Sequence, residues 1–264
     1  MYVIFDRINF FKLFTSLIKS GLPRSVINIL LNWYINLSVC VKWGSTLSTS
    51  FDVKSGVRQG SVLSPALFNV FINVFIYELK LCNYGCKMRG VFVGVIMYAD
   101  DLLLLSASVD GLQRMLNCCS ELSAKALINF NCKKSTCVII GPASKCVVKD
   151  MKLGSDSISW SNSFKYLGVC FSVSKKLFVD VSTIKQKNFA SCNCILAQAK
   201  CMDDLVKLKL LESYCLPILL YATAAMKLTI EQLCELNAAW NSVYRRIFGF
   251  NKWKSVRQFI GGLG

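Results

Sequence analysis

The sequence predicts an α+β fold in which an antiparallel sheet is backed by helices and a helical segment follows. Two apolar strands in residues 91–106 meet at a short acidic corner, and helical and strand-like patterns alternate around them over residues 1–172. From residue 175 onward the apolar spacing is helical only.

Composition limits the class of partner. The chain has 264 residues, enough for one large domain or two modest ones. Its 31 Lys and Arg residues against 15 Asp and Glu residues give a net charge of +16, which favours a polyanion such as nucleic acid. A surface that is charged only for solubility would show the same bias.

The hydropathy raises the question of a membrane. The mean hydropathy of +0.46 is high, but the longest apolar runs, residues 91–98 and 214–226, are shorter than the roughly 20 residues that a spanning helix needs. Residues 1–6 show neither the basic region nor the cleavage site of a signal peptide. We therefore expect no membrane partner and an intracellular location, in the nucleus or the cytoplasm.

Cysteine usage limits the redox and metal chemistry. The chain has 14 Cys and no His. The tight pairs are Cys82/Cys86 and Cys192/Cys194, which lack the CxxC spacing of zinc sites, and no His can complete a mixed site. We expect reduced, mostly buried thiols.

The first predicted elements are a helix and a hairpin. Pro23 precedes apolar residues spaced by three and four as far as residue 37, which predicts a helix with Pro23 in its first turn. Residues 38–43 alternate polar and apolar side chains, and Gly44-Ser45 leads into residues 51–53. This pattern predicts a β-hairpin.

A glycine loop and a long apolar helix follow. Gly56 and Gly60 flank Arg58 and Gln59 in a loop whose backbone can approach a ligand closely, although an ordinary strand–helix connector would look the same. Ser64-Pro65 predicts a helix start with Ser64 as the N-cap.

That helix is apolar nearly all round as far as Leu79, which is typical of a buried helix. Asn69 and Asn73 share one of its faces. Their amides either find partners in the core or face a nucleotide site.

The most informative stretch is VFVGVIMYADDLLLLS. It predicts a strand that ends at Met97, a tight corner at residues 98–101 and a second strand over residues 102–105. Buried Asp is strongly disfavoured unless it is paired or binds a metal, so Asp100 and Asp101 between buried arms suggest a platform for a hard cation such as Mg²⁺. An exposed turn is the alternative, because Asp is a common turn residue.

Further elements follow the acidic hairpin. Ser108 or Asp110 can cap a helix with apolar residues as far as Leu122. Three short strands are predicted after it: Cys137–Ile140, residues 158–160 and residues 164–171.

Composition shifts near residues 172–176, which suggests a joint. Helices are then predicted at about residues 181–201, 205–226 (interrupted by Pro217) and 230–248.

Four blocks of the sequence, in this order, resemble the reverse transcriptases of LINE-type (non-LTR) retrotransposons. The blocks are the RQGxxxSPxLF stretch that begins at Arg58, the Tyr-Ala-Asp-Asp hairpin, the motif-D-like residues 131–135 and the primer-contacting hairpin at residues 164–169. The resemblance implies a right-hand polymerase with a palm over residues 1–172, N-terminally truncated, a helical thumb over residues 173–264, and the fingers absent.

The resemblance also implies a site and its partners. The implied reaction is RNA-templated DNA synthesis with two Mg²⁺ ions, or with Mn²⁺ as a substitute. The implied catalytic and metal-binding residues are Asp100 and Asp101. The implied nucleotide- and template-binding residues are Phe5, Arg58, Gln59, Gly60, Tyr98, Ala99 and Lys134. The implied primer grip is Tyr166, Leu167 and Gly168. The implied partners are an RNA template, a DNA primer and deoxynucleoside triphosphates, with no indication of a protein partner.

The start of the chain limits the expected activity. In the resembled family a DxxKAFDxV motif carries the first catalytic Asp, and Asp6 matches the second Asp of that motif, so the first would fall just before Met1. We therefore expect negligible polymerase activity from residues 1–264 alone. The alternative is a non-catalytic, basic nucleic-acid-binding remnant.

The predicted thumb carries a basic bias. From Lys175 to the end there are 13 basic and 6 acidic residues. We expect Lys185, Lys187, Lys207 and Lys209 to hold primer–template through phosphates, in a salt-sensitive and sequence-independent manner. An ordinary helical bundle would look similar in sequence.

Overall fold

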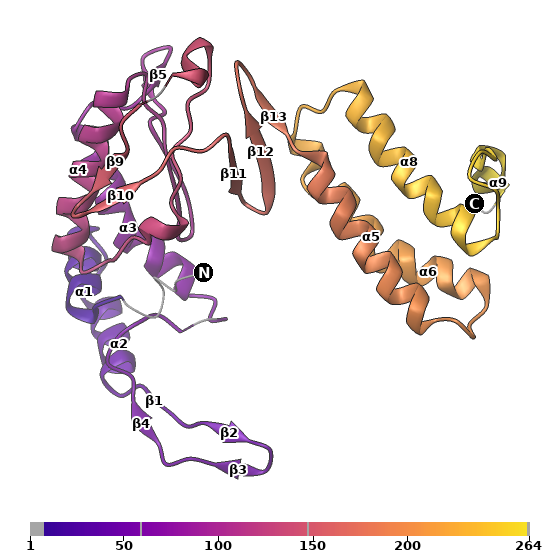
Figure 1. The fold of residues 1–264 in the computed structure, drawn as a ribbon. Helices are drawn as coiled ribbons and strands as arrows, with labels where there is room; N and C mark the ends of the chain where they lie inside the picture. The colour runs from indigo at the N-terminus through magenta and orange to yellow at the C-terminus, as the bar shows by residue number, and fades with distance from the viewer. Residues whose placement is uncertain (1–7, 59, 147, 263–264) are drawn as a thin grey trace. The chain divides into compact units, whose positions relative to one another are not determined.

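The computed structural model describes residues 8–58, 60–146 and 148–262. The chain divides into two compact units, each described below by itself. The first consists of residues up to 137 together with residues 147–160, and the second of residues 138–146 together with residues 161–264 (Figure 1). The predicted mixture of helices and antiparallel strands is confirmed.

Four helices form the body of the first unit. They are α1 (Phe10–Lys19), α2 (Arg24–Ile35), α3 (Ser64–Leu81) and α4 (Val109–Ala126). The buried face of α1 packs against α3, and Leu13, Leu17, Phe68 and Leu79 are among the most buried side chains of their common core. The side chain of Ser108 accepts a hydrogen bond from the amide of Gly111, which confirms Ser108 as the N-cap of α4.

Short antiparallel pairs make up the strands of the first unit. The pairs are β1 (Ser38–Val39) with β4 (Phe51–Asp52), β2 (Lys42–Trp43) with β3 (Thr46–Leu47), β5 (Lys87–Met88) with β6 (Val91–Phe92), β7 (Val95–Tyr98) with β8 (Asp101–Leu104), and β9 (Met151–Leu153) with β10 (Asp156–Ile158). The hairpin predicted at residues 38–53 is confirmed and extends beyond the end of α2 (Figure 1). The described strands of this unit pair two by two, so the antiparallel sheet that was predicted is present here as separate two-stranded pieces.

The strand predicted at Cys137–Ile140 is also wrong. Only Cys137 makes a bridge, with Trp160. The reason is that the following residues join the second unit, where the amide of Gly141 donates to the carbonyl of Ser174 at 3.1 Å. They cannot extend a ladder in the first unit.

The second unit combines one sheet with a set of helices. Its elements are β11 (Ser163–Tyr166), β12 (Val169–Val173), β13 (Leu177–Val179), α5 (Val181–Gln198), α6 (Asp204–Tyr214), α7 (Leu216–Leu220), α8 (Ile230–Ile247) and α9 (Arg257–Gly262). The sheet order is β11-β12-β13, all antiparallel. The helices predicted after residue 180 are confirmed, whereas α9 was not predicted. Position 172, where the palm was expected to end, lies inside β12.

The thiols differ from expectation. All 14 cysteines are free, but only Cys119, Cys137, Cys192 and Cys215 are buried, so the prediction of mostly buried thiols is wrong. Five of them, Cys40, Cys146, Cys194, Cys201 and Cys234, are exposed. Over the residues that the structure describes, no helix combines the length and the apolar character needed to cross a bilayer.

Candidate functional site

The acidic hairpin is tighter than the sequence predicted. Strands β7 and β8 pair in register from Val95 opposite Leu104 to Tyr98 opposite Asp101, which leaves only Ala99 and Asp100 in the turn. The expected hairpin is therefore confirmed, with a two-residue tip. This register fixes the position of both carboxylates, one in the turn and one at the start of β8.

The tip carries backbone strain. Ala99 has φ +50°, in the left-handed region that side chains with a Cβ adopt only at a cost of about 1 kcal/mol or more. Non-glycine residues held in such a conformation are found at functional sites. The packed arms of the hairpin maintain the strained turn.

The two faces of this hairpin differ. Val95, Met97, Leu102 and Leu104 pack against the core of the unit. The opposite face is open, with Tyr98 64% exposed, which corrects the expectation of wholly buried arms. Among the described residues, the core packs against only one face of the hairpin.

Both carboxylates remain accessible. Asp101 is exposed on the same open face as Tyr98, and Asp100 in the turn is half-buried. Among the described residues neither Asp forms an ion pair. The tip therefore presents two adjacent carboxylates whose charge no described Lys or Arg neutralises.

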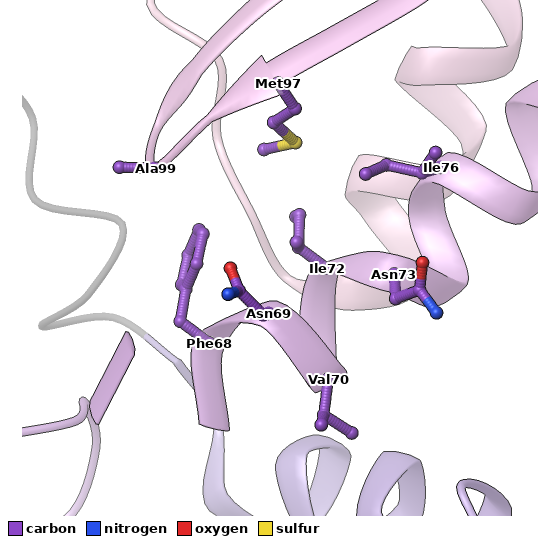
Figure 2. Close-up of a pocket in the computed structure, with 8 residues that line it drawn as sticks. All are labelled: Phe68, Asn69, Val70, Ile72, Asn73, Ile76, Met97 and Ala99. Carbon is purple, nitrogen blue, oxygen red and sulfur yellow. The ribbon is translucent and has the colours of Figure 1, made fainter. Parts of the chain in front are cut away.

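A pocket of about 340 Å³ lies between the hairpin and α3. Figure 2 shows Met97 and Ala99 on the hairpin side, and Phe68, Asn69 and Ile72 projecting from α3 toward them. The remaining lining residues are Val70, Asn73 and Ile76. The size lies at the lower end of the range for small-molecule sites, and the amides of Asn69 and Asn73 are its polar groups.

The surroundings of Asn69 and Asn73 show whether their amides find partners in the core. Both are exposed and both line the pocket, and neither amide has a hydrogen-bond partner among the described residues. They are therefore not satisfied within the core.

The loop before α3 is fixed by a buried hydroxyl. Ser64 is the first residue of α3 rather than its N-cap, which is Leu63, so the predicted capping role is wrong. The Ser64 hydroxyl instead donates to the carbonyl of Arg58 at 2.5 Å, and the amide of Ser61 donates to the same carbonyl at 3.2 Å. The Arg58 side chain remains exposed.

Gly60 has a conformational role. Its φ is +79°, and a Cβ at this position would meet no protein atom within 4 Å. The glycine is needed for its backbone conformation. Close packing within the chain does not require it.

The other expected nucleotide-binding residues lie on separate segments. Lys134 is the last residue of a 3-10 turn, Cys132–Lys134, and it is exposed. The side chain of Asn131, which caps this turn, accepts a hydrogen bond from the amide of Lys134 at 3.2 Å. Phe5 and Gln59 lie outside the described residues. The hairpin thus holds Tyr98, Ala99 and both aspartates together, and the pocket joins that group to α3.

The expected primer-grip residues form a second tight hairpin, in the second unit. Tyr166 pairs with Val169, and the two turn residues have positive φ, +46° at Leu167 and +82° at Gly168, as in a type I′ turn. Tyr221, at the end of α7, donates its hydroxyl to the carbonyl of Leu167 at 2.9 Å. This contact could not be predicted from the sequence, because the partners are 54 residues apart.

Three of the four lysines expected to bind phosphate are engaged within the chain. Lys185 pairs with Glu235, Lys207 with Asp204 and Lys209 with Glu212, at 2.5, 2.8 and 2.9 Å. Lys187 is exposed and makes no ion pair with a described residue. The paired ammonium groups are less available to phosphates than the sequence suggested.

Comparison with known proteins identifies the family. A family model described as reverse transcriptase (RNA-dependent DNA polymerase) matches residues 2–171. The matched range includes the loop at Arg58, the pocket and the acidic hairpin.

Relatives in mobile elements agree with this match. The chain is 25% identical over 183 residues to the Pol polyprotein of the R2DM element of Drosophila melanogaster, covering 66% of this chain and 17% of the relative. It is 24% identical over 261 residues to the Pol polyprotein of an R2 element of Popillia japonica, covering 94% of this chain and 41% of the relative. The polymerase of the mobile element jockey of Drosophila funebris is 25% identical over 182 residues, covering 64% of this chain and 19% of the relative.

The chain therefore spans less than half the length of these relatives. The resemblance that the four blocks suggested is confirmed by a match that covers more than half of the chain and by relatives of the expected kind. The chain belongs to the reverse transcriptase family, the RNA-dependent DNA polymerases, in the form that non-LTR retrotransposons carry.

Proposed function

We propose that this chain is the palm (residues 1–172) and helical thumb (residues 173–264) of an RNA-directed DNA polymerase, and that the β7–β8 hairpin is its catalytic centre. The observation that carries the proposal is the tip of that hairpin. It presents Asp100 and Asp101 side by side, without a cationic partner among the described residues, next to a pocket of about 340 Å³.

The donor atoms of the tip fit a hard cation. Asp100 and Asp101 offer carboxylate oxygens, the ligands that Mg²⁺ prefers, and Mg²⁺ commonly completes its shell with substrate phosphates and water. Over the described residues no group of three or more acidic, Cys or His side chains gathers at one point. Two bound Mg²⁺ ions, or Mn²⁺ ions in their place, would activate the primer 3′-hydroxyl and neutralise the charge of the leaving pyrophosphate.

The residues around the tip have positioning roles in this proposal. Tyr98 lies on the exposed face beside Asp101, where it would contact the primer end. The Arg58–Gly60 loop would contact the template base and the nucleotide, since Ser64 fixes the Arg58 carbonyl and leaves its side chain exposed. Lys134 would contact the triphosphate.

The pocket suggests where the incoming nucleotide is held. Asn69 and Asn73 bring two amides without described partners to an otherwise apolar cavity. A base or sugar with both polar edges and apolar faces suits such a lining. Ala99 lines the same pocket next to Asp100, so a nucleotide there would have its phosphates near that carboxylate.

In the second unit, the β11–β12 turn would hold the primer. Tyr166, Leu167 and Gly168 form a turn with positive φ at its two central residues, and Tyr221 holds it from α7. Such a fixed turn can contact the sugar–phosphate backbone of a primer without recognising its base sequence.

Iron-directed cleavage tests whether the hairpin holds the metal. Fe²⁺ in place of Mg²⁺, with ascorbate and peroxide, generates hydroxyl radicals at the bound ion, and we expect the chain to be cut near residue 100. The cut should disappear when Asp100 and Asp101 are both changed to Asn. Asp52→Asn, at an exposed carboxylate of the β1–β4 pair, is the control and should leave the cut unchanged.

The cleavage experiment also distinguishes a polymerase centre from the alternative function, nucleic-acid binding without catalysis. A basic remnant that only binds nucleic acid would bind a primer–template duplex yet give no cut at the hairpin. Cleavage that persists in the double variant would show that the ion is held elsewhere.

A further inference from the structure

The C-terminal end of the second unit is rich in basic residues. After Glu235 the chain has no Asp or Glu, and its basic residues are Arg245, Arg246, Lys252, Lys254 and Arg257. Arg245 and Arg246 lie in the last turn of α8, Lys252 and Lys254 follow it, and Arg257 begins α9. Such a cluster is attractive to a polyanion.

A tight turn follows α8. The helix ends at Ile247, and Gly249, with φ +63°, reverses the chain. The amide of Lys254 donates to the carbonyl of Asn251 at 3.0 Å, which makes Lys252 and Trp253 the central residues of a four-residue turn. We call residues 251–254 the C-terminal turn.

Hydrogen bonds fix this turn to α8. The guanidinium Nε of Arg245 donates to the carbonyl of Lys254 at 2.9 Å, and the carbonyl of Arg245 accepts from the amide of Phe250 at 2.9 Å. One residue of the helix thus holds the chain on both sides of the turn. The position of the turn relative to α8 is set by these bonds.

An aromatic cluster forms the base of the turn. Phe259 of α9 lies 4.6 Å from Phe248 and 5.0 Å from Phe250, measured between ring centroids. Val256 is fully buried in the same core. Helix α9 therefore packs back against the end of α8, as the ribbon also shows (Figure 1).

Trp253 is presented outward from this base. Its side chain is 87% exposed, although every other aromatic residue after Ile247 is packed into the cluster. The ammonium of Lys252 lies 5.3 Å from the centre of the Trp253 ring, and that of Lys254 lies 4.6 Å from the Phe250 ring. Neither lysine forms an ion pair with a described residue.

We propose that the C-terminal turn is a binding site for single-stranded nucleic acid, in which an unpaired base stacks on Trp253 and adjacent phosphates bind Lys252 and Lys254. The combination of a cationic surface and a projecting aromatic ring is the one that such sites use. A duplex covers its base faces by stacking, so an outward ring has no base to contact there. The site lies outside the matched residues 2–171 and is independent of the proposed polymerase chemistry.

Fluorescence anisotropy with a labelled 12-nucleotide single strand tests the site in the full chain, without divalent ions or nucleoside triphosphates. We expect Trp253→Ala to weaken binding at least about five-fold, which equals roughly 1 kcal/mol, the lower end for one stacked base. Trp253→Tyr keeps an aromatic plane and should bind within about two-fold of wild type. Because the reaction mixture supports no synthesis, the result does not depend on whether the chain is a polymerase.

Matched controls locate the effect. Trp43 is 85% exposed and also follows a lysine, but it lies on the β2–β3 hairpin without the basic cluster. Trp43→Ala should bind like wild type. Each phosphate contact on a single strand contributes about 0.7 to the slope of log affinity against log salt. The double variant Lys252→Gln/Lys254→Gln removes two such contacts and should reduce the slope by about 1.4.

Labelling with fluorotryptophan gives a readout that does not depend on a variant. In ¹⁹F spectra the Trp253 resonance should shift when the single strand is added, and should not shift with a blunt duplex of the same sequence. Equal affinity of wild type and Trp253→Ala would overturn the proposal, as would an equal loss in Trp43→Ala. A Trp253 shift with phosphatidylserine vesicles but not with the oligonucleotide would overturn it in favour of a membrane surface.

Discussion

At the scale of the residue, the hydroxyl of Ser64 links two parts of the proposed active site. It is buried, and it donates to the carbonyl of Arg58 six residues earlier. The bond ties the loop that carries Arg58 to the first turn of α3, the helix that lines the pocket further along with residues 68–76. A buried hydrogen bond of this kind contributes about 0.5–1.5 kcal/mol to stability.

We expect Ser64→Ala to lower the free energy of unfolding by about 1 kcal/mol, because the Arg58 carbonyl loses its buried donor. Urea unfolding measures the change. Ser61→Ala is the control, since that hydroxyl only accepts a long bond of 3.4 Å near the surface. If Ser64→Ala were no less stable than Ser61→Ala, the role given to the buried hydroxyl would be wrong.

The sequence could predict some site residues and not others. Asp100 and Asp101 could be predicted because two carboxylates between apolar runs are chemically conspicuous. The acceptor of Ser64 and the contact of Tyr221 could not, since both depend on how the chain folds back on itself. Ser64-Pro65 looked like a cap followed by a first turn, and only the geometry shows that the hydroxyl points to the preceding loop.

At the scale of the element, the β11–β12 turn depends on a contact from a helix. Gly168 has φ +82°, and a Cβ added there would lie 3.2 Å from the ring of Tyr221. The same tyrosine holds the carbonyl of Leu167. The turn is therefore held by its own conformation and by α7 together.

We expect Gly168→Ala to destabilise the second unit by more than Gly249→Ala does. Gly249 also has positive φ, +63°, but a Cβ there would meet nothing within 4 Å, so it measures conformational strain of about 1 kcal/mol alone. The excess in Gly168→Ala should vanish in a Tyr221→Ala background. A double-mutant cycle by urea unfolding measures the coupling, and zero coupling would contradict the contact.

Long helices with a repeated apolar spacing could be predicted from the sequence, whereas short elements could not. The helix α8 extends over 18 residues with a regular apolar spacing, and its capping box of Thr229 and Gln232 marks its start. Helix α9 has only 6 residues and no such signal. The strand expected after Cys137 failed because tertiary context decides whether an apolar run pairs.

At the scale of the whole molecule, the distribution of charge determines which lysines can hold nucleic acid. The described salt bridges all lie in the second unit and engage Lys185, Lys207 and Lys209. Lys187 on α5 is exposed without such a partner. The sequence could predict the net charge of this part of the chain, and helical spacing could predict the i,i+3 pairs within α6. The pair of Lys185 with Glu235 depends instead on how α5 packs against α8.

We expect Lys187→Gln to weaken binding of a primer–template duplex more than Lys209→Gln does. Lys187 can release counterions from a phosphate, whereas Lys209 already pairs with Glu212 at 2.9 Å. The slope of log affinity against log salt should fall by about 0.9 in Lys187→Gln. Affinities that do not change with salt, or equal losses in both variants, would contradict this assignment.

The buried thiols give the molecule a pH dependence. Burial raises the pKa of Cys119 to about 12 and that of Cys192 to about 12, while an unfolded thiol ionises near 8.5. Between these values the unfolded chain loses protons that the folded chain keeps, so the folded state is favoured below about pH 8.5 and stability falls as the pH rises toward 12.

We expect the free energy of unfolding to fall less steeply above pH 9 in Cys119→Ala than in wild type, by up to about 1.4 kcal/mol per pH unit. Cys40→Ala is the matched control because Cys40 is exposed, and it should keep the wild-type slope. Equal slopes in all three proteins would mean that the thiol of Cys119 ionises in the folded chain.

The most direct test of the account is Mg²⁺-dependent extension of a DNA primer on an RNA template. It is measured in a polypeptide that joins residues 1–264 to the upstream residues of a related Pol polyprotein, with residues 1–264 alone measured beside it. We expect extension by the wild type and a loss on the order of 100- to 1000-fold in Asp100→Asn, because a single electrostatic group at a reacting centre can be worth that much. Undiminished extension by Asp100→Asn would contradict the assignment of the β7–β8 hairpin as the catalytic centre.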